Sequence, residues 1–306
     1  MNVLVTGATG FVGYAVAAYL VDQGHTVVGL ARSDDAALPP GVTRALGDIR
    51  TIDVLTDVLT NVDAVCHLAA RTRARESKIE PLGYWRTNVD GTLTVLDAML
   101  ATGTRRLVVG STCAVYGEAD QQPIDEDAPE HPSNPYGSSK LAADNAVADV
   151  ASTGAIGAVR LRPCNVAGAL AGKTDHDQSR LIPRMLAVQL DTAPELVING
   201  DGDAIRDFVH VADVATAFAL ALDACEPGTT HTYNIGSGQR TSVLNVLHAV
   251  ERVTGRPVRR RHAPAVPEPR ELRADSAAIR TALGWQPDSS SLDQIVGDAW
   301  ATLTST

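Results

Sequence analysis

The chain has 306 residues, of which 44% are apolar, 20% are charged and 4% are aromatic, and its formal net charge is −10. This length accommodates one large α/β domain, or a dinucleotide-binding domain with a smaller lobe, and the apolar fraction excludes a disordered or fibrous chain. The acidic balance argues against a nucleic-acid partner, although arginines gathered at one site can still bind an anionic substrate.

Short apolar runs alternate with helical patterns through the first half of the chain. The predicted buried strands lie at residues 3–5, 26–30, 63–68, 106–109 and 156–161, and the predicted helices lie near 12–23, 51–60, 87–102 and 136–153. Apolar strands separated by helices indicate a parallel sheet with helices on both faces. The sequence therefore predicts a doubly wound α/β fold of the Rossmann type.

The pattern changes after about residue 165. A polar, glycine-containing loop at 168–179 is long enough to form a lid over a site. Beyond it we expect a short helix near 180–190, a strand at 196–198, a helix at 211–223 and a proline-rich loop at 263–269. We therefore expect a dinucleotide-binding domain over residues 1–165, which parts of 206–238 join, and a smaller mixed α/β substrate lobe over 166–306.

The cysteines Cys66, Cys113, Cys164 and Cys225 are far apart in the chain and form no Cys-x-x-Cys pair. We therefore expect reduced thiols rather than a disulfide framework, and no metal site. No charged segment precedes a hydrophobic signal core, and no apolar run is long enough to span a membrane. These features predict a cytoplasmic protein without a membrane partner.

A glycine-rich segment lies between the first strand and the first helix, with the sequence Thr6-Gly7-Ala8-Thr9-Gly10-Phe11-Val12-Gly13. Glycines at these positions permit a tight turn, a close approach of the backbone to a pyrophosphate, and close packing of helix on strand. The N–H groups at the start of the helix would then bind the phosphates. The candidate cofactor-binding residues are Gly7, Gly10, Phe11, Val12 and Gly13, and their spacing resembles the short-chain dehydrogenase/reductase superfamily.

The end of the second strand leaves the choice between NAD and NADP open. An NAD site usually has Asp or Glu there to bind the ribose 2′-hydroxyl, but Leu30 is followed by Ala31 and Arg32. An arginine without an acidic residue suits the 2′-phosphate of NADP. Asp34 and Asp35, just beyond, are either ribose ligands or turn residues.

The segment Tyr136-Gly137-Ser138-Ser139-Lys140 carries the most specific chemical signal in the sequence. Residues four apart on a helix lie on one face, so the phenol and the ammonium are neighbours. We expect Lys140, together with the nicotinamide charge, to lower the pKa of Tyr136. Tyr136 could then take a proton from a sugar hydroxyl while hydride leaves the same carbon.

Two observations favour a catalytic pair over a chance match. The chain has only three lysines, Lys78, Lys140 and Lys173, and uses arginine for nearly all its other positive charge, so a lysine at this position suggests that a compact ammonium is needed. In addition, the hydroxyl-bearing segment 111–117 follows a strand at the sheet edge where ligands bind. Its hydroxyls can stabilise charge on the reacting oxygen.

With these motifs, the chain resembles the extended short-chain dehydrogenases of the UDP-glucose 4-epimerase and nucleotide-sugar dehydratase group, from its first strand nearly to its C-terminus. Further matching segments are His67 to Ala70, Asn88 to Thr92, Arg160 to Asn165, Arg206 to Val211 and Tyr233 to Gly238.

The resemblance implies roles for particular residues. Thr112 would supply the triad hydroxyl, with Ser111 as the adjacent candidate, and Lys140 would also bind the nicotinamide ribose. The residues implied to contact the cofactor are Asp48 and Ile49 at the adenine, and Leu68, Ala69, Ala70, Asn88 and Pro163 at the nicotinamide. Those implied to contact the nucleotide diphosphate are Asn165, Leu181 and Arg206.

The same site can support epimerisation, dehydration or ketoreduction. Dehydratases of the group have an Asp-Glu pair directly after the hydroxyl residue, where this chain has Cys113 and Ala114. Alanine cannot move a proton, which argues against dehydration, while Cys113 is polar enough to contact the substrate. A ketoreductase using exchangeable NADPH remains the alternative, because Arg32 lacks an acidic partner.

The substrate side departs from the resemblance. The phosphate-clamping arginine expected near residue 265 is replaced by Ala265, so Arg270 or Arg180 is the candidate replacement. Asn199 stands where an aromatic residue often stacks on the base, and Leu272 falls near the position that limits bulk at sugar C2. A UDP-hexose is the favoured substrate.

The resemblance also implies a homodimer formed by helices 87–102 and 137–153. The side chains expected to be exposed for this contact, although they also suit core packing, are Leu93, Leu96, Leu141 and Ala142. Together these features predict a nucleotide-sugar 4-epimerase that acts through a transient 4-keto sugar and tightly bound NAD. The alternatives are an NADPH-dependent nucleotide-4-ketosugar reductase and a dinucleotide sensor without enzymatic activity.

Overall fold

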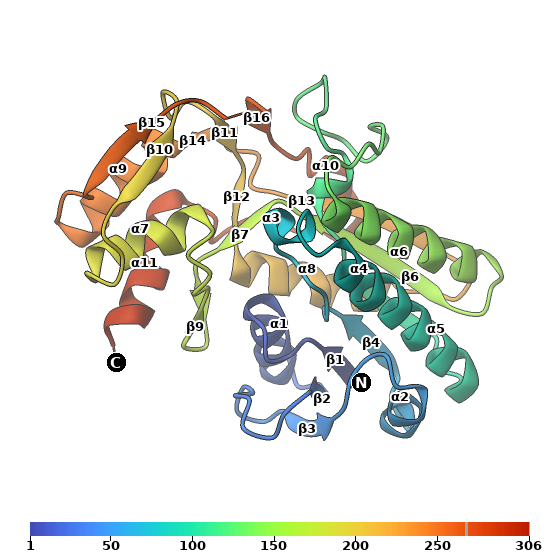
Figure 1. Ribbon diagram of the computed structural model, residues 1–306. Helices are drawn as coiled ribbons and strands as arrows, with labels where there is room; N and C mark the ends of the chain where they lie inside the picture. The colour runs from blue at the N-terminus through green and yellow to red at the C-terminus, as the bar shows by residue number, and fades with distance from the viewer. Residues whose placement is uncertain (267–268, 306) are drawn as a thin grey trace.

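The main sheet is parallel and doubly wound. In the computed structural model, which describes residues 1–266 and 269–305, the strand order is β13-β6-β5-β4-β1-β2-β3 with parallel pairing throughout (Figure 1). The strands are β1 Asn2–Thr6, β2 Thr26–Ala31, β3 Thr43–Leu46, β4 Ala64–His67, β5 Arg106–Gly110, β6 Gly157–Pro163 and β13 Thr230–Ile235. The order reverses between β1 and β4, where open α/β sheets bind ligands. The predicted fold class is confirmed.

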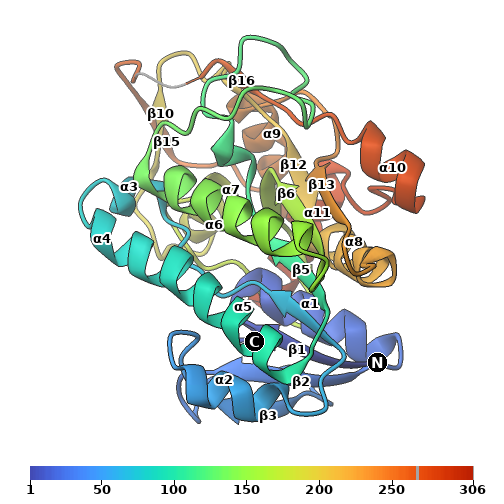
Figure 2. The ribbon, with the colours of Figure 1, turned by 90° about the vertical axis from the view of Figure 1, so that its right-hand side faces the viewer.

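Helices cover both faces of this sheet. α1 (Phe11–Asp22) and α8 (Val211–Ala224) pack together on one face, and α2 (Ile52–Leu59), α5 (Gly91–Thr102) and α6 (Pro135–Ser152) pack on the other. α5 and α6 run side by side (Figure 2). The two faces therefore have separate apolar cores, which the alternating side chains of the strands supply.

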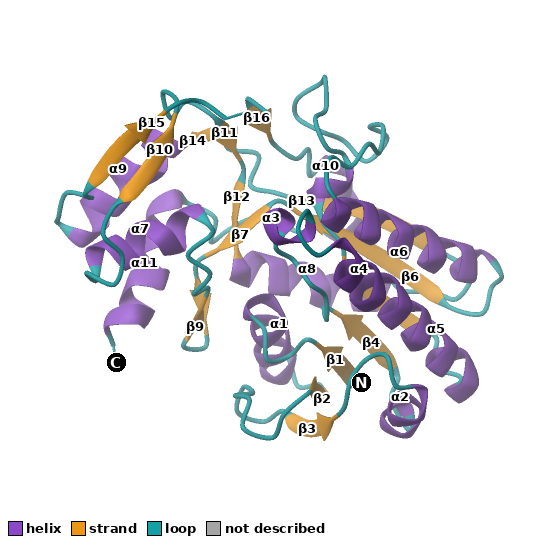
Figure 3. Cartoon of the chain, viewed as in Figure 1, coloured by secondary structure: helices purple, strands orange, loops and turns teal. Residues whose placement is uncertain are grey.

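A second lobe has a core of its own beyond the carboxyl edge of the sheet (Figure 3). Its core lies among α7 (Leu181–Gln189), α9 (Val243–Thr254), α11 (Leu292–Thr304) and the parallel pair β10 (Leu196–Asn199) and β15 (Arg260–Ala263). The chain passes between the two lobes more than once, because α8 and β13 belong to the first lobe although they follow segments of the second lobe in the sequence.

Short elements complete the described part of the chain. They are α3 Ala74–Ser77, α4 Pro81–Tyr84, the π-helical turn η1 Trp85–Asp90, the 3₁₀ turn η2 Cys113–Val115, β7 Asn165–Ala167, β8 Ala169–Leu170, β9 Lys173–Thr174, β11 Ile205–Arg206, β12 Phe208–His210, β14 Thr241–Ser242, β16 Glu271–Leu272 and α10 Ala277–Leu283. No helix within residues 1–266 and 269–305 is both long and apolar enough to cross a membrane.

Several predicted elements differ from the observed ones. The predicted helix at 87–102 is a π-helical turn followed by α5, and the predicted loop at 168–179 contains the hairpin of β8 and β9. In the predicted loop at 263–269, Ala263 ends β15, residues 264–266 have no regular structure, and residues 267–268 lie outside the described residues. The sequence pattern did not predict α9, α10 or α11, although Ser242 and Asn245 form a capping box at the start of α9.

His67 links the sheet to the helices behind it. Its Nδ1 lies 2.8 Å from the Thr6 hydroxyl and its Nε2 lies 3.1 Å from the Thr92 hydroxyl. Thr6 Oγ1 already accepts hydrogen bonds from the backbone N–H groups of Leu68 and Ala69, and the Thr92 hydroxyl donates to Asn88 O. These partners are all satisfied by a neutral ring that carries its proton on Nε2, and burial lowers the pKa of His67 to about 3.

We therefore expect His67 to destabilise the fold as the pH falls. Between the unfolded pKa near 6.5 and the folded pKa of about 3, the unfolded chain binds the additional proton, so stability decreases with decreasing pH. From pH 7 to pH 5 the loss attributable to His67 is about 2 kcal/mol. The measurement is urea unfolding of the wild type and His67→Asn at both pH values. Equal pH dependence in the two proteins would contradict this assignment.

Candidate active site

The glycine-rich turn after β1 fits a dinucleotide pyrophosphate. Gly7 has a φ of +71°, and a Cβ there would lie 2.8 Å from Ala69 N and from the carbonyl carbon of Leu68. A Cβ at Gly13 would overlap the carbonyl oxygen of Gly7. No side chain caps the start of α1 at Gly10, so the first-turn N–H groups of this helix are available to phosphate oxygens.

The adenosine side of this crevice carries charges of both signs. Asp48 accepts hydrogen bonds from Arg50 at Nε and Nη2, 2.9 and 2.8 Å, and these lower the pKa of Asp48 to about 2. Arg32 is exposed and lies near enough to lower that pKa further, and Ile49 is buried beside it. An ionised Asp48 can accept a hydrogen bond from the ribose 2′-hydroxyl of NAD, whereas Arg32 can bind the 2′-phosphate of NADP. This part of the site therefore does not distinguish the two cofactors.

The helix that carries the predicted catalytic pair, α6, begins at Pro135 after an Asn134 cap, whose side chain accepts a hydrogen bond from Gly137 N. This start places Tyr136 in the first turn and Lys140 one turn further along. Both side chains line one cavity. Burial lowers the pKa of Lys140, and the Asp144 carboxylate partly opposes this effect.

The predicted lowering of the Tyr136 pKa is wrong for the protein chain alone. Burial raises the pKa of Tyr136, and this effect exceeds the lowering by the Thr112 hydrogen bond and the Arg180 charge. Among the largest contributions, Arg180 is the cation that opposes this rise. A positively charged dinucleotide bound nearby would lower the pKa of Tyr136 further.

Thr112 lies between β5 and η2, and its hydroxyl accepts a hydrogen bond from Ala114 N. Its hydroxyl is also close enough to the Tyr136 phenol to lower the pKa of that phenol. Ser111, the adjacent candidate, instead donates to the buried Asp144 carboxylate at 2.7 Å. The geometry therefore favours Thr112 over Ser111 as the hydroxyl that faces the phenol.

Asn88 holds the loop after β4 against the catalytic helix. It lies on η1, and π-helical turns are frequent at functional sites. Its side chain accepts from Arg71 N and donates to Arg71 O and to the Ser139 hydroxyl, which lies in the turn between Tyr136 and Lys140. Asn88 is thus a positioning residue.

A cavity of about 1040 Å³ joins the two lobes beside this helix. Its volume is at the upper end of the range for small-molecule sites. The predicted site residues that line it are Val12, Leu68, Ala70, Thr112, Cys113, Tyr136, Lys140, Pro163, Asn165, Arg180, Leu181 and Arg206. The cavity therefore brings together the predicted catalytic set with predicted residues of both ligands.

The other predicted site residues do not line this cavity. They are Gly7, Gly10, Phe11, Gly13, Arg32, Asp48, Ile49, Ala69, Asn88 and Arg270. Most lie along the dinucleotide crevice after β1 or β4, or behind the catalytic helix. Arg270 is exposed and stands apart, so of the two candidate phosphate clamps the cavity includes only Arg180.

Arginines gather on the substrate side of the cavity: Arg73, Arg75, Arg180, Arg184 and Arg206. Arg180 forms an ion pair with Asp175 at 3.1 Å, and Arg184 donates to Glu195 O. Arg206 donates to Pro269 O at 3.0 Å. This concentration of guanidinium groups suits a diphosphate, despite the overall negative charge of the chain.

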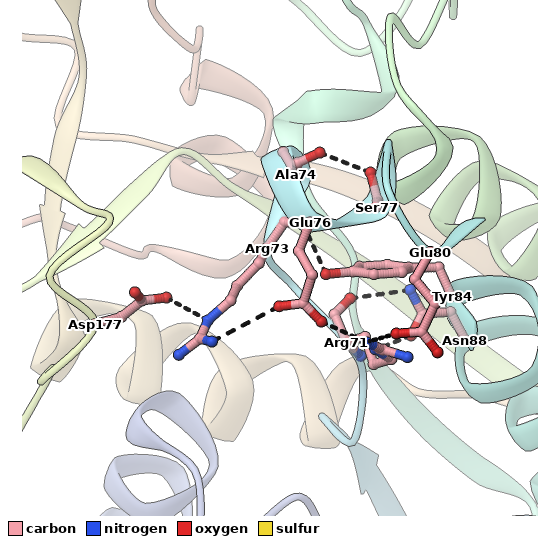
Figure 4. A network of polar contacts seen from close by, with 9 residues as sticks. All are labelled: Arg71, Arg73, Ala74, Glu76, Ser77, Glu80, Tyr84, Asn88 and Asp177. Atoms are coloured by element: carbon pink, nitrogen blue, oxygen red, sulfur yellow. Dashed lines mark hydrogen bonds and ion pairs between the residues drawn. The ribbon is translucent and has the colours of Figure 1, made fainter. Parts of the chain in front are cut away.

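A polar network that the sequence did not reveal includes residues of the cavity wall, among them Arg73 and Asp177 (Figure 4). Arg73, from the loop after β4, binds Asp177 of the second lobe with 2.9 Å between Nε and Oδ2. Tyr84 donates to Arg73 O at 2.7 Å, and its ring meets that of Tyr136 edge-on, 6.4 Å between centroids. The only sequence signal was that Asp177 lies in the predicted lid loop.

The side chains expected at a dimer contact do not all face outward. Leu93 is 43% exposed, and Leu141 and Ala142 are half-buried. Leu96 is 2% exposed and belongs to the core between α5 and the sheet, so its predicted exposure is wrong. Residues three apart on a helix only partly share a face. Leu93 therefore reaches the surface of α5, whereas Leu96 packs into the core.

The chain matches the model of the NAD dependent epimerase/dehydratase family over residues 3–236. It is 41% identical to a UDP-glucose 4-epimerase of Streptomyces lividans, over 97% of this chain and 94% of that protein. It is 39% identical to a UDP-glucose 4-epimerase of Corynebacterium glutamicum, over 98% of this chain and 95% of that protein.

A solved structure has the same fold throughout. The UDP-glucose-4-epimerase of Stenotrophomonas maltophila, with bound NAD and formylated UDP-arabinopyranose, is 32% identical. The match covers 100% of this chain and 98% of that chain, with a TM-score of 0.93.

Proposed function

The chain belongs to the NAD dependent epimerase/dehydratase family, and from this we propose that it is a nucleotide-sugar 4-epimerase acting through a transient 4-keto sugar and tightly bound NAD. The observation that carries the proposal is the convergence of Thr112, Tyr136 and Lys140 on one cavity beside the glycine-rich turn. Its relatives include UDP-glucose 4-epimerases that align with nearly the whole chain.

Tyr136 is the acid–base group of this mechanism. Its phenol oxygen takes the proton from the sugar 4-hydroxyl as C4 is oxidised, and returns it once the keto sugar has turned over. The Thr112 hydroxyl holds the phenol oxygen of Tyr136 in place by a hydrogen bond. The charge of Arg180 stabilises the phenolate form of Tyr136. Lys140 would hold the nicotinamide ribose of a bound NAD⁺, which would supply the hydride acceptor and, once reduced, the hydride donor.

The cavity residues favour epimerisation over dehydration. Dehydration needs an additional acid and base next to Thr112, but Cys113 donates to Arg162 O and Ala114 carries no titratable group. Arg180 and Arg206 in the cavity wall suit the diphosphate of a nucleotide sugar, and the UDP-glucose 4-epimerases among the relatives favour a UDP-hexose as substrate.

The domain and assembly assignments are part of the same proposal. Residues 1–165, with parts of 206–238, bind the dinucleotide, and residues 166–306 mainly bind the nucleotide sugar. The protein acts in the cytoplasm as a homodimer through α5 and α6, with Leu93 on the exposed side of the contact.

Tyr136→Phe should lower the rate of UDP-galactose and UDP-glucose interconversion at least about 10²-fold, because the proton acceptor at O4 is lost. The matched control is Tyr19→Phe, which removes the same hydroxyl from α1 and should leave the rate unchanged. NMR of the sugar anomeric signals gives both rates. Near-normal turnover by Tyr136→Phe would contradict the assignment.

Purified enzyme should release NAD(H), and no NADP(H), when it is denatured, since a returning hydride requires a cofactor that stays bound. Enzymatic cycling assays specific for each dinucleotide distinguish the two. An empty protein that consumes added NADPH with a 4-keto sugar would establish the reductase instead, in agreement with the exposed Arg32. A protein that binds a dinucleotide but shows neither activity would be a sensor.

A further inference from the structure

Two cysteines far apart in the sequence meet in the cavity wall. Cys113 begins η2, Cys164 lies between β6 and β7, and their sulfurs are 3.1 Å apart. Cys164 donates its S–H to Cys113, and Cys113 donates to Arg162 O at 3.1 Å. Both thiols are partly exposed and line the cavity, whereas Cys66 and Cys225 are buried in the core of the first lobe.

We propose that Cys113 and Cys164 are a modification site, a thiol pair that a low-molecular-weight disulfide converts reversibly into an intramolecular disulfide. The structural basis is the direct contact of the two sulfurs at a surface that small molecules reach through the cavity. A disulfide bond is about 2.0 Å long, so the sulfurs have only about 1 Å to close. Neither Cys66 nor Cys225 has such access.

The hydrogen bonds give the two thiols different roles. The hydrogen bond to Cys113, together with burial, raises the pKa of the Cys164 thiol well above its usual range. Cys164 therefore keeps its proton and directs its S–H at Cys113, so Cys113 is the attacking sulfur. Cys164 is then the resolving sulfur.

The exchange balances without another oxidant. The Cys113 thiolate attacks one sulfur of the small disulfide, forms a mixed disulfide and releases one thiolate. Cys164 then attacks Sγ of Cys113, the mixed bond breaks, and the second small thiolate leaves. The two protons of the cysteines end on the two released thiols. The protein pair is oxidised by two electrons, and the small disulfide is reduced by two.

The bond would alter the catalytic arrangement. Cys113 directly follows Thr112, whose hydroxyl both caps η2 and contacts the Tyr136 phenol. Drawing Cys113 toward Cys164 displaces the adjacent Thr112, and a misplacement of about 1 Å can cost on the order of 10²-fold in rate. This effect on activity rests on the proposed 4-epimerase function, but formation of the bond does not.

The test is incubation of the purified full-length protein with glutathione disulfide, followed by alkylation and peptide mass analysis. The wild type should yield a joined peptide that contains Cys113 and Cys164, two hydrogens lighter than the separate peptides and without glutathione. Its epimerase rate should fall at least about tenfold and return with dithiothreitol. Cys66→Ala, which leaves the pair intact, should behave in the same way.

Cys164→Ala should instead accumulate glutathione on Cys113 and form no joined peptide, because the resolving thiol is gone. A wild type that also retains glutathione on Cys113, or that yields no joined peptide, would overturn the proposed site. A joined peptide with an unchanged rate would overturn its effect on catalysis. If the reduced protein has no epimerase activity, the proposed function fails, while the mass analysis still decides the thiol pair.

Discussion

The position of the helix that carries Tyr136 and Lys140 depends on a buried ion pair between Arg162 on β6 and Asp144 on α6. Arg162 is 1% exposed and donates to Asp144 Oδ2 at 3.2 Å, and Ser111 donates to the same oxygen. This oxygen therefore joins the helix that carries Tyr136 to two neighbouring strands of the sheet. Arg162 also pairs with Glu130, so the loss of Arg162, which leaves the Asp144 carboxylate buried without its cation, is the costlier change, about 3–5 kcal/mol. Buried contacts behind α6, rather than contacts within the cavity, therefore fix the position of Tyr136 and Lys140.

The same burial that fixes the catalytic helix opposes its chemistry. It raises the pKa of Tyr136 and lowers that of Lys140, so in the protein chain alone both groups are shifted toward their neutral forms. Arg180 lies at the start of α7 in the second lobe and lowers the Tyr136 pKa from across the cavity. Acid–base chemistry therefore depends on charges that meet only when both lobes and the dinucleotide surround the phenol, which links catalysis to ligand binding.

Local motifs made the first lobe and the placement of Tyr136 beside Lys140 predictable, because both depend on residues close together in the sequence. The glycine turn at residues 6–13 and the i, i+4 pair Tyr136 and Lys140 are of this kind. The rest depends on contacts between distant segments. Arg73 and Asp177 pair across 104 residues, and the Cys113–Cys164 contact spans 51. No local pattern signals either one. The predicted lowering of the Tyr136 pKa is also wrong, because burial by the whole fold raises this pKa by more than the nearby polar groups lower it.

The most direct test of hydride transfer at C4 is the fate of a deuterium label there. UDP-glucose deuterated at C4 is incubated with purified enzyme and no added cofactor, and the product is followed by NMR. A bound dinucleotide that takes and returns the same hydride predicts UDP-galactose with the deuterium still at C4, in a reaction that Tyr136→Phe largely abolishes. Loss of the label to solvent, or turnover only when NADPH is added, would contradict the account.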